Sequence, residues 1–330
     1  MRRRRFCALA ATVAAGAATM RARARPVADD APFAFAVIGD TPYNALEEAA
    51  LARVLADIDD DVRFVLHLGD LKSGWEPCSD ELLVRRHAAL SAARRPLVFT
   101  PGDNEWVDCG QSRAGGYEPL DRLRMLRRLF FARREAGRDP MRIVDQAQSD
   151  PGHAFPENLR WRTGSVLFVT INVPGSRNGQ AAGEALAAHN ARRNSANDAW
   201  LREAFALAAR ESAPAVVVAM HANPGFEQDD HRARLPGDPS PDLDAYAGLR
   251  ALLRELANGF AGDVLLLHGD THRFRADRPL RGARGLPVRN FERIECFGSP
   301  YANAWLRITV DPRAPSRFAV QPRRLDEARP

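Results

Sequence analysis

The stretch Leu97–Glu105 reads LVFTPGDNE and decides the fold class. Its first four residues are apolar or β-branched, which predicts a short buried strand. Proline and glycine follow at once, and then come the polar residues Asp103, Asn104 and Glu105. Because glycine allows a sharp turn, these polar side chains are expected directly beyond the end of the strand.

The same succession occurs at four other apolar runs. Phe33–Ile38 precedes Gly39-Asp40, Val62–Leu68 precedes Gly69-Asp70, Ala215–Met220 precedes His221, and Val264–Leu267 precedes His268-Gly269-Asp270-Thr271-His272. Between these runs lie segments with helical spacing of apolar residues, and such alternation predicts an α/β layered fold. Ligands of α/β sheets bind beyond the carboxyl ends of strands. We therefore expect the five polar clusters to meet at one edge.

Other elements follow from periodicity. Expected helices are Ala45–Ile58, Asp80–Ala93 with Ser79 as its cap, about Leu120–Arg134, Asn194–Arg210 and Leu243–Ala257. Expected strands are Val166–Asn172, Phe291–Phe297, Trp305–Val310 and Phe318–Gln321. The segment at about 109–160 is otherwise irregular, and so long an excursion favours a lid or a substrate wall. Because no linker divides the chain, residues 26–330 are expected to form a single domain that contains this insertion.

Composition excludes several classes of protein. The chain is 45% hydrophobic and 27% charged, which is ordinary for a globular protein. Its formal net charge is +5, but residues 1–25 hold seven arginines and no acid, which leaves −2 for the remainder. No nucleic-acid partner is therefore expected. No run after the first twenty residues is apolar for long enough to span a membrane.

Residues 1–25 have the pattern of an export signal. Arg2–Arg5 form a charged start, Phe6–Ala18 is a short apolar stretch, and small residues include a possible cleavage site. Arg3-Arg4-Arg5-Phe6 also fits a twin-arginine signal. We expect a periplasmic or secreted protein, exported by the Sec or Tat route, whose leader ends between residues 17 and 30. The alternative is a disordered basic tail on a cytoplasmic protein.

The five clusters, in their order, resemble the signature of the calcineurin-like metallophosphoesterases. That signature runs D-x-H, G-D, G-N-H-[ED], H and G-H-x-H, and the resemblance covers about Phe33 to His272. It implies a four-layer α-β-β-α sandwich of two mixed sheets flanked by helices. It also implies hydrolysis of phosphate esters, in which a metal-bound hydroxide attacks the phosphoryl group in line. The expected substrate is a small phosphate ester or a phosphorylated molecule.

The resemblance also implies a ligand set for two divalent metal ions. A carboxylate between two ions must serve both, and the match gives that role to Asp70. The remaining implied ligands are Asp40 and His272 for one ion, and Asp103, His221 and Asp270 for the other.

The chain departs from the family signature at four positions. Pro42 stands in place of the histidine of D-x-H and binds no metal, while Asp103 and Asp270 replace an asparagine and a histidine. This gain of carboxylates favours Mn, Fe or Mg, with Zn or Ca as further possibilities and a one-metal site as an alternative. Asn104 replaces a histidine; it donates hydrogen bonds but supplies no proton. A non-catalytic metal- or phosphate-binding module on the same fold is therefore the alternative function.

Several neighbouring residues are secondary candidates. Asn104 is expected to stabilise the phosphoryl group, and His268 either orients a ligand or acts as the missing general acid. Asn172 and Arg177 are candidate contacts for a substrate phosphate, although solvated loop residues are the simpler alternative for Arg177. His67, between two leucines, is expected to be packed in the core, and Tyr43 is placed near the lost histidine.

The cysteines suggest one disulfide and one free thiol. Cys7 lies in the leader, whereas Cys78 and Cys109 each follow a motif whose loop should leave the same edge of the sheet. We therefore expect a disulfide between Cys78 and Cys109, which export would permit. Cys296, in a late apolar strand, is expected to be a buried free thiol.

Overall fold

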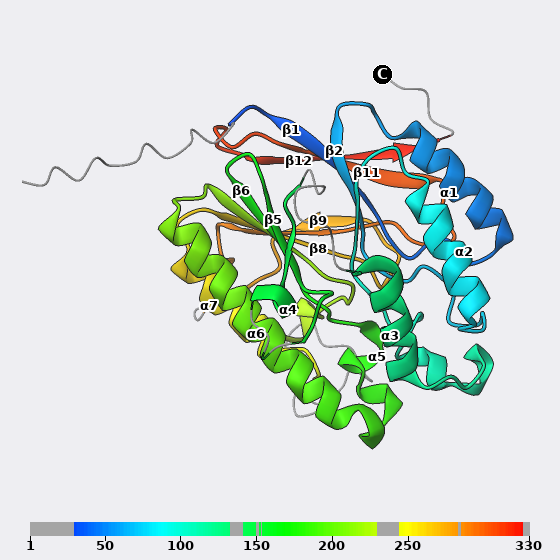
Figure 1. Ribbon diagram of the computed structural model, residues 1–330. Coiled ribbons are helices and arrows are strands. Elements are labelled where there is room, and N and C mark those ends of the chain that lie inside the picture. Colours follow the sequence, from blue (N-terminus) through cyan, green and yellow to red (C-terminus); the bar gives the residue numbers. More distant parts are fainter. Residues whose placement is uncertain are drawn as a thin grey trace, which may run out of the picture.

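Two mixed β-sheets pack face to face and are flanked by helices in the computed structural model (Figure 1). The structure describes residues 30–132, 141–149, 152, 154–229, 244–282 and 285–325. The α/β class and the sandwich of two mixed sheets flanked by helices, which the sequence predicts, are confirmed. The predicted leader lies outside the described residues.

The first sheet has the strand order β12-β11-β1-β2-β3. Its strands are β1 (Phe33–Ile38), β2 (Val62–His67), β3 (Leu97–Phe99), β11 (Ala304–Val310) and β12 (Phe318–Arg324). Strands β1, β2 and β3 run parallel, whereas β11 is antiparallel to β1 and to β12. The chain therefore leaves β1, β2 and β3 at one edge, where Asp40, Asp70 and Asp103 follow.

The second sheet has the order β4-β5-β6-β7-β8-β10-β9. Its strands are β4 (Val144–Asp145), β5 (Leu159–Thr163), β6 (Val166–Thr170), β7 (Ala215–Ala219), β8 (Asp263–His268), β9 (Arg275–Asp277) and β10 (Phe291–Glu295). The central strands β6, β7, β8 and β10 are parallel. His221 and Asp270 follow β7 and β8, so the second sheet also delivers predicted ligands at the carboxyl ends of its strands.

Aromatic side chains join the two sheets. The Phe168 ring of β6 lies 5.4 Å from that of Phe35 in β1 and 5.3 Å from that of Phe64 in β2, both in edge-to-face contact. Trp161 of β5 stacks on Phe168 at 5.1 Å. Such rings bury large apolar areas and gain about 0.5–1.5 kcal/mol per pair from their geometry. They fix the spacing of the sheets and hence the spacing of the loops at their edges.

Helices cover the outer faces of both sheets. The first sheet carries α1 (Ala45–Asp57), α2 (Asp80–Ser91) and α3 (Pro119–Phe130), and the second carries α6 (Ala187–Arg210) and α7 (Ala247–Gly259) (Figure 1). Trp200 and Leu253 of the latter pair pack with Val216 and Leu266 of the second sheet. The predicted cap of α2 is confirmed, because Ser79 accepts a hydrogen bond from the backbone of Leu82. Two shorter helices are α4 (Gln146–Ser149) and α5 (Gly175–Asn178).

The structure differs from the prediction mainly between residues 109 and 160. The expected helix there is α3, and it ends at Phe130. Strands β4 and β5 and helix α4 were not expected. In β5, the buried Leu159 and Trp161 alternate with the partly exposed Arg160 and Arg162. This alternation is typical of a half-buried strand, but the high arginine content of the segment favoured an irregular loop in the sequence analysis.

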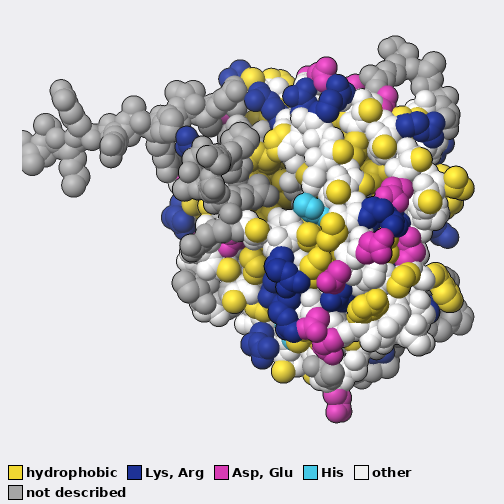
Figure 2. Space-filling model, turned by 45° about the vertical axis from the view of Figure 1, so that its right-hand side comes forward, with side chains coloured by type: hydrophobic (Ala, Val, Ile, Leu, Met, Phe, Trp, Pro, Cys, Tyr) yellow, Lys and Arg dark blue, Asp and Glu magenta, His cyan; other side chains and the backbone are white. Residues whose placement is uncertain are grey.

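The surface carries charges of both signs. On the face drawn in Figure 2, basic and acidic side chains of the described residues are interspersed with hydrophobic ones, without an extended basic area. Among the described residues, no helix has the length and apolar character needed to cross a membrane.

Candidate metal centre

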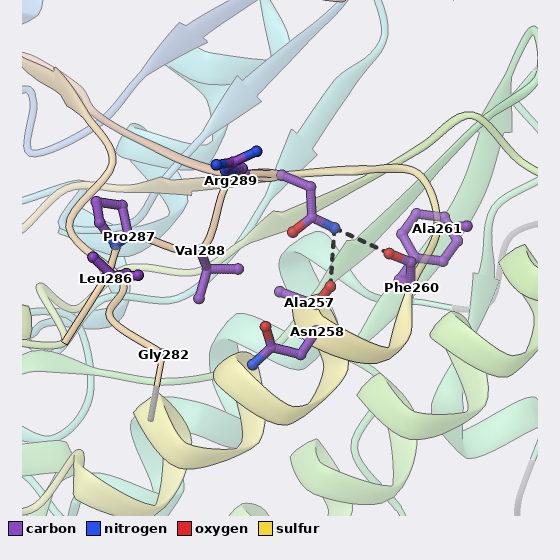
Figure 3. Close-up of a pocket in the computed structure, with 10 residues that line it drawn as sticks. Ala257, Asn258, Phe260, Ala261, Gly282, Leu286, Pro287, Val288 and Arg289 are labelled. Atoms are coloured by element: carbon purple, nitrogen blue, oxygen red, sulfur yellow. Dashed lines mark hydrogen bonds between the residues drawn. The ribbon is translucent and has the colours of Figure 1, made fainter. Parts of the chain in front are cut away.

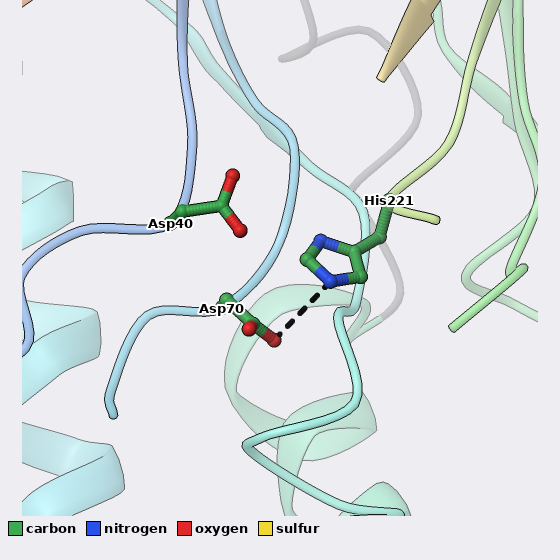
Figure 4. A group of neighbouring side chains, drawn as sticks. All are labelled: Asp40, Asp70 and His221. Carbon is green, nitrogen blue, oxygen red and sulfur yellow. Dashed lines mark ion pairs between the residues drawn. The ribbon is translucent and has the colours of Figure 1, made fainter. Parts of the chain in front are cut away.

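The predicted ligands of both sheets converge. The carboxylates of Asp40 and Asp70 and the imidazole of His221 point toward one another from three different strand ends (Figure 4). All three side chains are buried, and each offers one ligand atom within 4.8 Å of the others. Nε2 of His221 lies 3.5 Å from Oδ1 of Asp70. Within the part of the chain that the structure describes, this is the first of two groups with the composition of a metal site.

The second group shares His221 with the first. Nε2 of His221 lies 3.0 Å from Oδ1 of Asp103 and 3.9 Å from Oδ1 of Asp270. His272 joins from the side of the first group, with Nε2 3.5 Å from Oδ1 of Asp40. All six residues that the sequence predicts as ligands therefore lie in one contiguous cluster, in which Asp70 and His221 are central.

Left-handed backbone conformations present several of these ligands. The φ angles are 51° for Asp40, 55° for Asp70, 81° for Asp270 and 63° for His272. Residues other than glycine seldom adopt such angles, and they concentrate at functional sites. These sharp turns direct the side chains back over the strand ends, whereas an extended backbone would carry them away from the cluster.

Both histidines are oriented as metal ligands usually are. Nδ1 of His221 lies 2.8 Å from the carbonyl oxygen of Leu68, and Nδ1 of His272 lies 2.7 Å from that of Ser299. A carbonyl oxygen only accepts hydrogen bonds, so Nδ1 carries the hydrogen. Nε2 is thus turned toward the carboxylates, an arrangement that fixes the ring and its tautomer for metal binding.

The electrostatics call for a cation. Burial raises the pKa of Asp40 to about 8, that of Asp270 to about 6, and that of Asp70 well above its usual range. Burial lowers the pKa of His221, but the carboxylates of Asp70, Asp103 and Asp40 outweigh it and raise that pKa well above its ordinary value. Buried carboxylates at such density are stabilised by divalent ions. The donor set, rich in oxygen with two imidazole nitrogens, fits hard or borderline ions.

Asp70 is held on all sides. Its Oδ1 accepts hydrogen bonds of 3.0 Å from the backbone N–H groups of Asp103 and Asn104. Its Oδ2 accepts from Nδ2 of Asn104 at 2.5 Å and from the hydroxyl of Tyr43 at 3.0 Å. A Cβ atom at Gly102 would lie 2.0 Å from Oδ1 of Asp70, so only glycine fits there. These contacts give one fixed orientation to the carboxylate that the sequence places between the ions.

Two residues that contact the ligand cluster, Glu105 and Ser176, were given no role in the sequence analysis. Glu105 is fully buried, and its Oε1 accepts from the backbone of Gly102 at 2.5 Å and of Asp70 at 3.2 Å. The hydroxyl of Ser176 lies 2.8 Å from Oδ2 of Asp103. Glu105 could have been identified because it is the acidic residue that ends the third family motif. Nothing in the sequence around Ser176 indicates its contact with Asp103.

The second candidate for phosphate binding, Arg177, lies beside the cluster, whereas Asn172 does not. Arg177 is exposed in α5, directly after Ser176, so it borders the second group. Asn172 is fully buried, and its Nδ2 donates to Oε1 of Glu157 at 3.1 Å. We therefore correct Asn172 from a substrate contact to a member of a buried polar network.

His67 and His268 are both buried inside strands. His67 is packed in the core as expected, with Nε2 2.9 Å from the carbonyl oxygen of Thr41. Nδ1 of His268 lies 2.9 Å from the carbonyl oxygen of Gly269, and burial lowers its pKa to about 3. An imidazole that is neutral at pH 7 and closed to solvent is a poor general acid, which leaves His268 a role in positioning the strand end.

The predicted disulfide is present and lies next to the cluster. Cys78 and Cys109 are bonded with a Cα–Cα separation of 5.7 Å, and Cys296 is a buried free thiol, as the sequence predicts. The two bridging sulfur atoms lie 3.4 and 3.5 Å from the carbonyl oxygen of Asn104. Nζ of the fully buried Lys72 donates to the same oxygen at 2.8 Å. The disulfide and this lysine together fix the backbone that carries Asn104.

A separate hollow lies at the end of α7, away from the ligands. It is bordered by Asn258, Pro287 and Arg289, and Nδ2 of Asn290 closes one side through hydrogen bonds to the carbonyl oxygens of Ala257 and Phe260 (Figure 3). Its described lining contains no carboxylate, histidine or cysteine. The acidic cluster is therefore the better candidate for chemistry.

Comparisons with known proteins agree with this geometry. A family model described as calcineurin-like phosphoesterase matches residues 33–274. Among solved structures the chain is similar to PhoD, with a TM-score of 0.54 and 14% identity over 92% of this chain and 73% of that one. It is also similar to purple acid phosphatase PPD1 from yellow lupin (Lupinus luteus) seeds, with a TM-score of 0.51 and 13% identity over 89% of this chain.

Identities this low show the fold alone, and this chain spans only 52% of the lupin protein. No curated protein matches the chain. The family model covers well over half of the sequence and includes every residue of the cluster. The chain belongs to the calcineurin-like phosphoesterase family.

Proposed function

We propose that the protein hydrolyses small phosphate esters with two divalent metal ions, Mn, Fe or Mg being the best suited to its ligands. One observation carries the proposal: strand ends from both sheets bring carboxylates and two oriented imidazoles to one buried cluster. The proposed ligands are Asp40, Asp70 and His272 for one ion and Asp70, Asp103, His221 and Asp270 for the other. Zn or Ca in the same positions, or a single bound ion, are variants that metal analysis distinguishes.

Bound divalent ions supply Lewis acidity and an activated water at neutral pH. The side chains and backbone around the cluster fix the orientation of the proposed ligands. Asp70 is held by four hydrogen-bond donors, two on each carboxylate oxygen, which fix the orientation of its carboxylate. The two histidines are locked through Nδ1, which keeps Nε2 directed at the ligand cluster. No side-chain base is needed for the attack on phosphorus.

Asn104 is the residue that we propose for contact with the phosphoryl group. It is partly exposed and lies against Asp70, so its Nδ2 group borders both the cluster and solvent. A donor in such a position stabilises negative charge on the phosphoryl oxygens in the transition state. Asn104 supplies no proton, so leaving groups that depart without protonation are the favoured substrates.

Arg177 and Ser176 are proposed to border the substrate on the other side. Ser176 contacts Asp103, and Arg177 follows it with an exposed guanidinium. An arginine fork binds phosphate oxygens in pairs and suits an anionic ester.

Export is proposed as the setting of this activity. A disulfide persists in oxidising compartments and is rare in the cytoplasm. The bridge between Cys78 and Cys109 therefore supports a periplasmic or secreted location, in agreement with the signal-like first 25 residues.

The test combines metal analysis with turnover. Purified protein is stripped of metal, reloaded separately with Mn, Fe, Mg, Zn or Ca, and assayed with an aryl phosphate monoester and an aryl diester. We expect activity that depends on the metal and disappears in Asp70→Asn. Metal binding without turnover of any ester would instead favour the non-catalytic binding module, and absence of both would overturn the proposal.

A further inference from the structure

Tyr43 stands inside the ligand cluster. Its hydroxyl lies 3.0 Å from Oδ2 of Asp70 and 3.2 Å from Nε2 of His272. Its ring meets the imidazole of His272 edge to face, with centroids 5.3 Å apart. Tyr43 directly follows Pro42, which occupies the position of the histidine in the D-x-H motif. The phenol oxygen is thus brought to the side of the cluster that has lost a ligand.

The spacing of these atoms is that of ligands around one ion. Two atoms that each lie about 2.1 Å from an ion are about 3.0 Å apart at right angles and about 3.4 Å apart at tetrahedral angles. The distances from the hydroxyl of Tyr43 to Asp70 and His272, 3.0 and 3.2 Å, fall in this range. Nε2 of His272 is also 3.5 Å from Oδ1 of Asp40.

The start of α1 holds Tyr43 in this place. The backbone N–H of Tyr43 donates to Oε2 of Glu47 at 2.8 Å. The other carboxylate oxygen of Glu47 accepts from the hydroxyl of Ser299 at 2.6 Å, and the carbonyl of Ser299 orients His272. Asn44 caps α1 by accepting from the backbone of Glu47 at 3.0 Å. One carboxylate therefore positions both the tyrosine and the loop that orients the histidine.

We propose that the phenol oxygen of Tyr43 is a ligand of the metal ion held by Asp40, Asp70 and His272, in the coordination position that Pro42 leaves open. This inference rests on the proposed metal centre but not on turnover. On coordination the phenol loses its proton to solvent, as other protonated ligands do. An anionic oxygen in place of a neutral nitrogen shifts this position toward hard, highly charged ions, so Fe(III) is the ion that it should favour most.

The experiment compares the full chain with Tyr43→Phe and a matched control, Tyr117→Phe. Tyr117 is partly buried beside the disulfide and packs under Arg122, outside the cluster. Metal-free proteins are loaded with Fe(III), and visible absorption and resonance Raman spectra are recorded for phenolate-to-iron charge transfer. In parallel, calorimetric titration with Mn²⁺ gives the number of ions and their affinities, and thermal unfolding checks the fold.

Wild-type protein and Tyr117→Phe are expected to show the charge-transfer band, and Tyr43→Phe to lack it. Tyr43→Phe should also bind one of two Mn²⁺ ions at least about 10-fold more weakly, since even outer contacts of metal ligands alter affinity by 10–100-fold. A band that persists in Tyr43→Phe overturns the proposal, as does unchanged affinity at both sites.

The wild-type spectrum decides the matter if Tyr43→Phe fails to fold, because iron-loaded wild-type protein without phenolate vibrations has no tyrosine ligand. If Fe(III) does not bind, the Mn²⁺ affinities decide. Wild-type protein that shows tyrosine ligation but hydrolyses no ester refutes the proposed function alone. Wild-type protein that hydrolyses esters without tyrosine ligation refutes only this inference.

Discussion

Nδ2 of Asn104 donates a 2.5 Å hydrogen bond to Oδ2 of Asp70, so the side chain that replaces the family's histidine is tied directly to the central carboxylate. The same Nδ2 lies 3.3 Å from the hydroxyl of Tyr43. Both hydrogens of this amide are therefore directed at residues of the cluster, and a substrate oxygen that accepts one of them must replace the longer hydrogen bond to Tyr43. Such an amide stabilises charge but protonates nothing.

The first prediction concerns leaving groups. The wild-type protein should hydrolyse aryl phosphates much faster than alkyl phosphates, because Asn104 supplies no proton to the leaving oxygen. Asn104→His should narrow this ratio by restoring a proton donor at the same position, an effect of about 10²-fold for a positioned general acid. The measurement is kcat/KM for a series of esters of graded leaving-group pKa. Equal rates for alkyl and aryl esters, with chemistry limiting, would reveal another general acid.

Asp70→Asn should abolish both hydrolysis and paired metal binding. The substitution keeps the shape of the side chain but removes the charge that we propose two ions share, and it turns an amide hydrogen-bond donor toward groups that already donate to Asp70. We expect a loss of at least about 10³-fold in kcat/KM, the upper range for removal of one preorganised electrostatic contact. Elemental analysis should find fewer ions per chain. Full activity in this variant would mean that the site lies elsewhere.

Arg177→Ala should weaken substrate binding. The guanidinium is exposed beside Ser176 and touches none of the proposed ligands in the described contacts, so metal content should not change. KM should rise about 10-fold with little change in kcat, as is expected when a contact is made equally with substrate and transition state. Arg177→Lys keeps the charge but loses the forked guanidinium, so its KM should lie between those of the wild-type protein and Arg177→Ala. An unchanged KM would leave Arg177 as a solvated loop residue.

The disulfide should matter for both stability and the site. The bridge closes a segment with a sequence separation of 31, and losing it should lower the free energy of unfolding by roughly 3–4 kcal/mol. Because the sulfur atoms border the carbonyl oxygen of Asn104, the paired substitution Cys78→Ser with Cys109→Ser should also reduce kcat. Denaturant unfolding and steady-state kinetics measure the two effects. Lower stability with unchanged kcat would show that Lys72 alone holds this backbone.

Metal-free protein should lose stability as the pH rises from about 6.5 to 8. Asp40 has a pKa of about 8 in the fold but near 3.8 when exposed, so the folded state binds the extra proton and loses that advantage as pH approaches 8. The raised pKa values of Asp70 and His221 act in the same direction. The lowered pKa values of His67 and His268 act in the opposite direction, mainly below pH 6.5.

Asp40 alone should contribute a loss of roughly 1–2 kcal/mol, from about 1.4 kcal/mol per pH unit for one proton, and the other raised groups add to it. Denaturant titrations at several pH values measure it, with the exposed Asp60→Asn as control for Asp40→Asn. Asp40→Asn should flatten the dependence. Saturating Mn²⁺ should reverse it, because metal competes with protons for the same ligands. Stability that rises over this range in metal-free protein would contradict the burial of protonated Asp40.

Sequence patterns predicted that the six residues of the cluster would converge, because each of them follows a strand. A strand that ends in Gly-Asp fixes where the carboxylate emerges, and parallel neighbours bring such ends together without any knowledge of packing. Tyr43 and Ser176 contact the cluster through loop conformations with no sequence period, so their hydrogen bonds were not predictable. Asn172 shows the converse failure. Its position after β6 favours the site, but its side chain turns into a buried network that only tertiary packing determines.

Lys72 is the chain's one lysine, and its ammonium group is enclosed between the carbonyl oxygens of Ser73 and Asn104. Amine-reactive reagents therefore find a single side-chain target, and they reach it only when the loop behind Asn104 opens. The rate at which an acyl group adds to Nζ, measured as one mass shift on one peptide, therefore reports how often the loop that carries Asn104 opens. Ions or phosphate analogues that rigidify this loop should lower the acylation rate of Lys72, and no engineered label is needed to measure it.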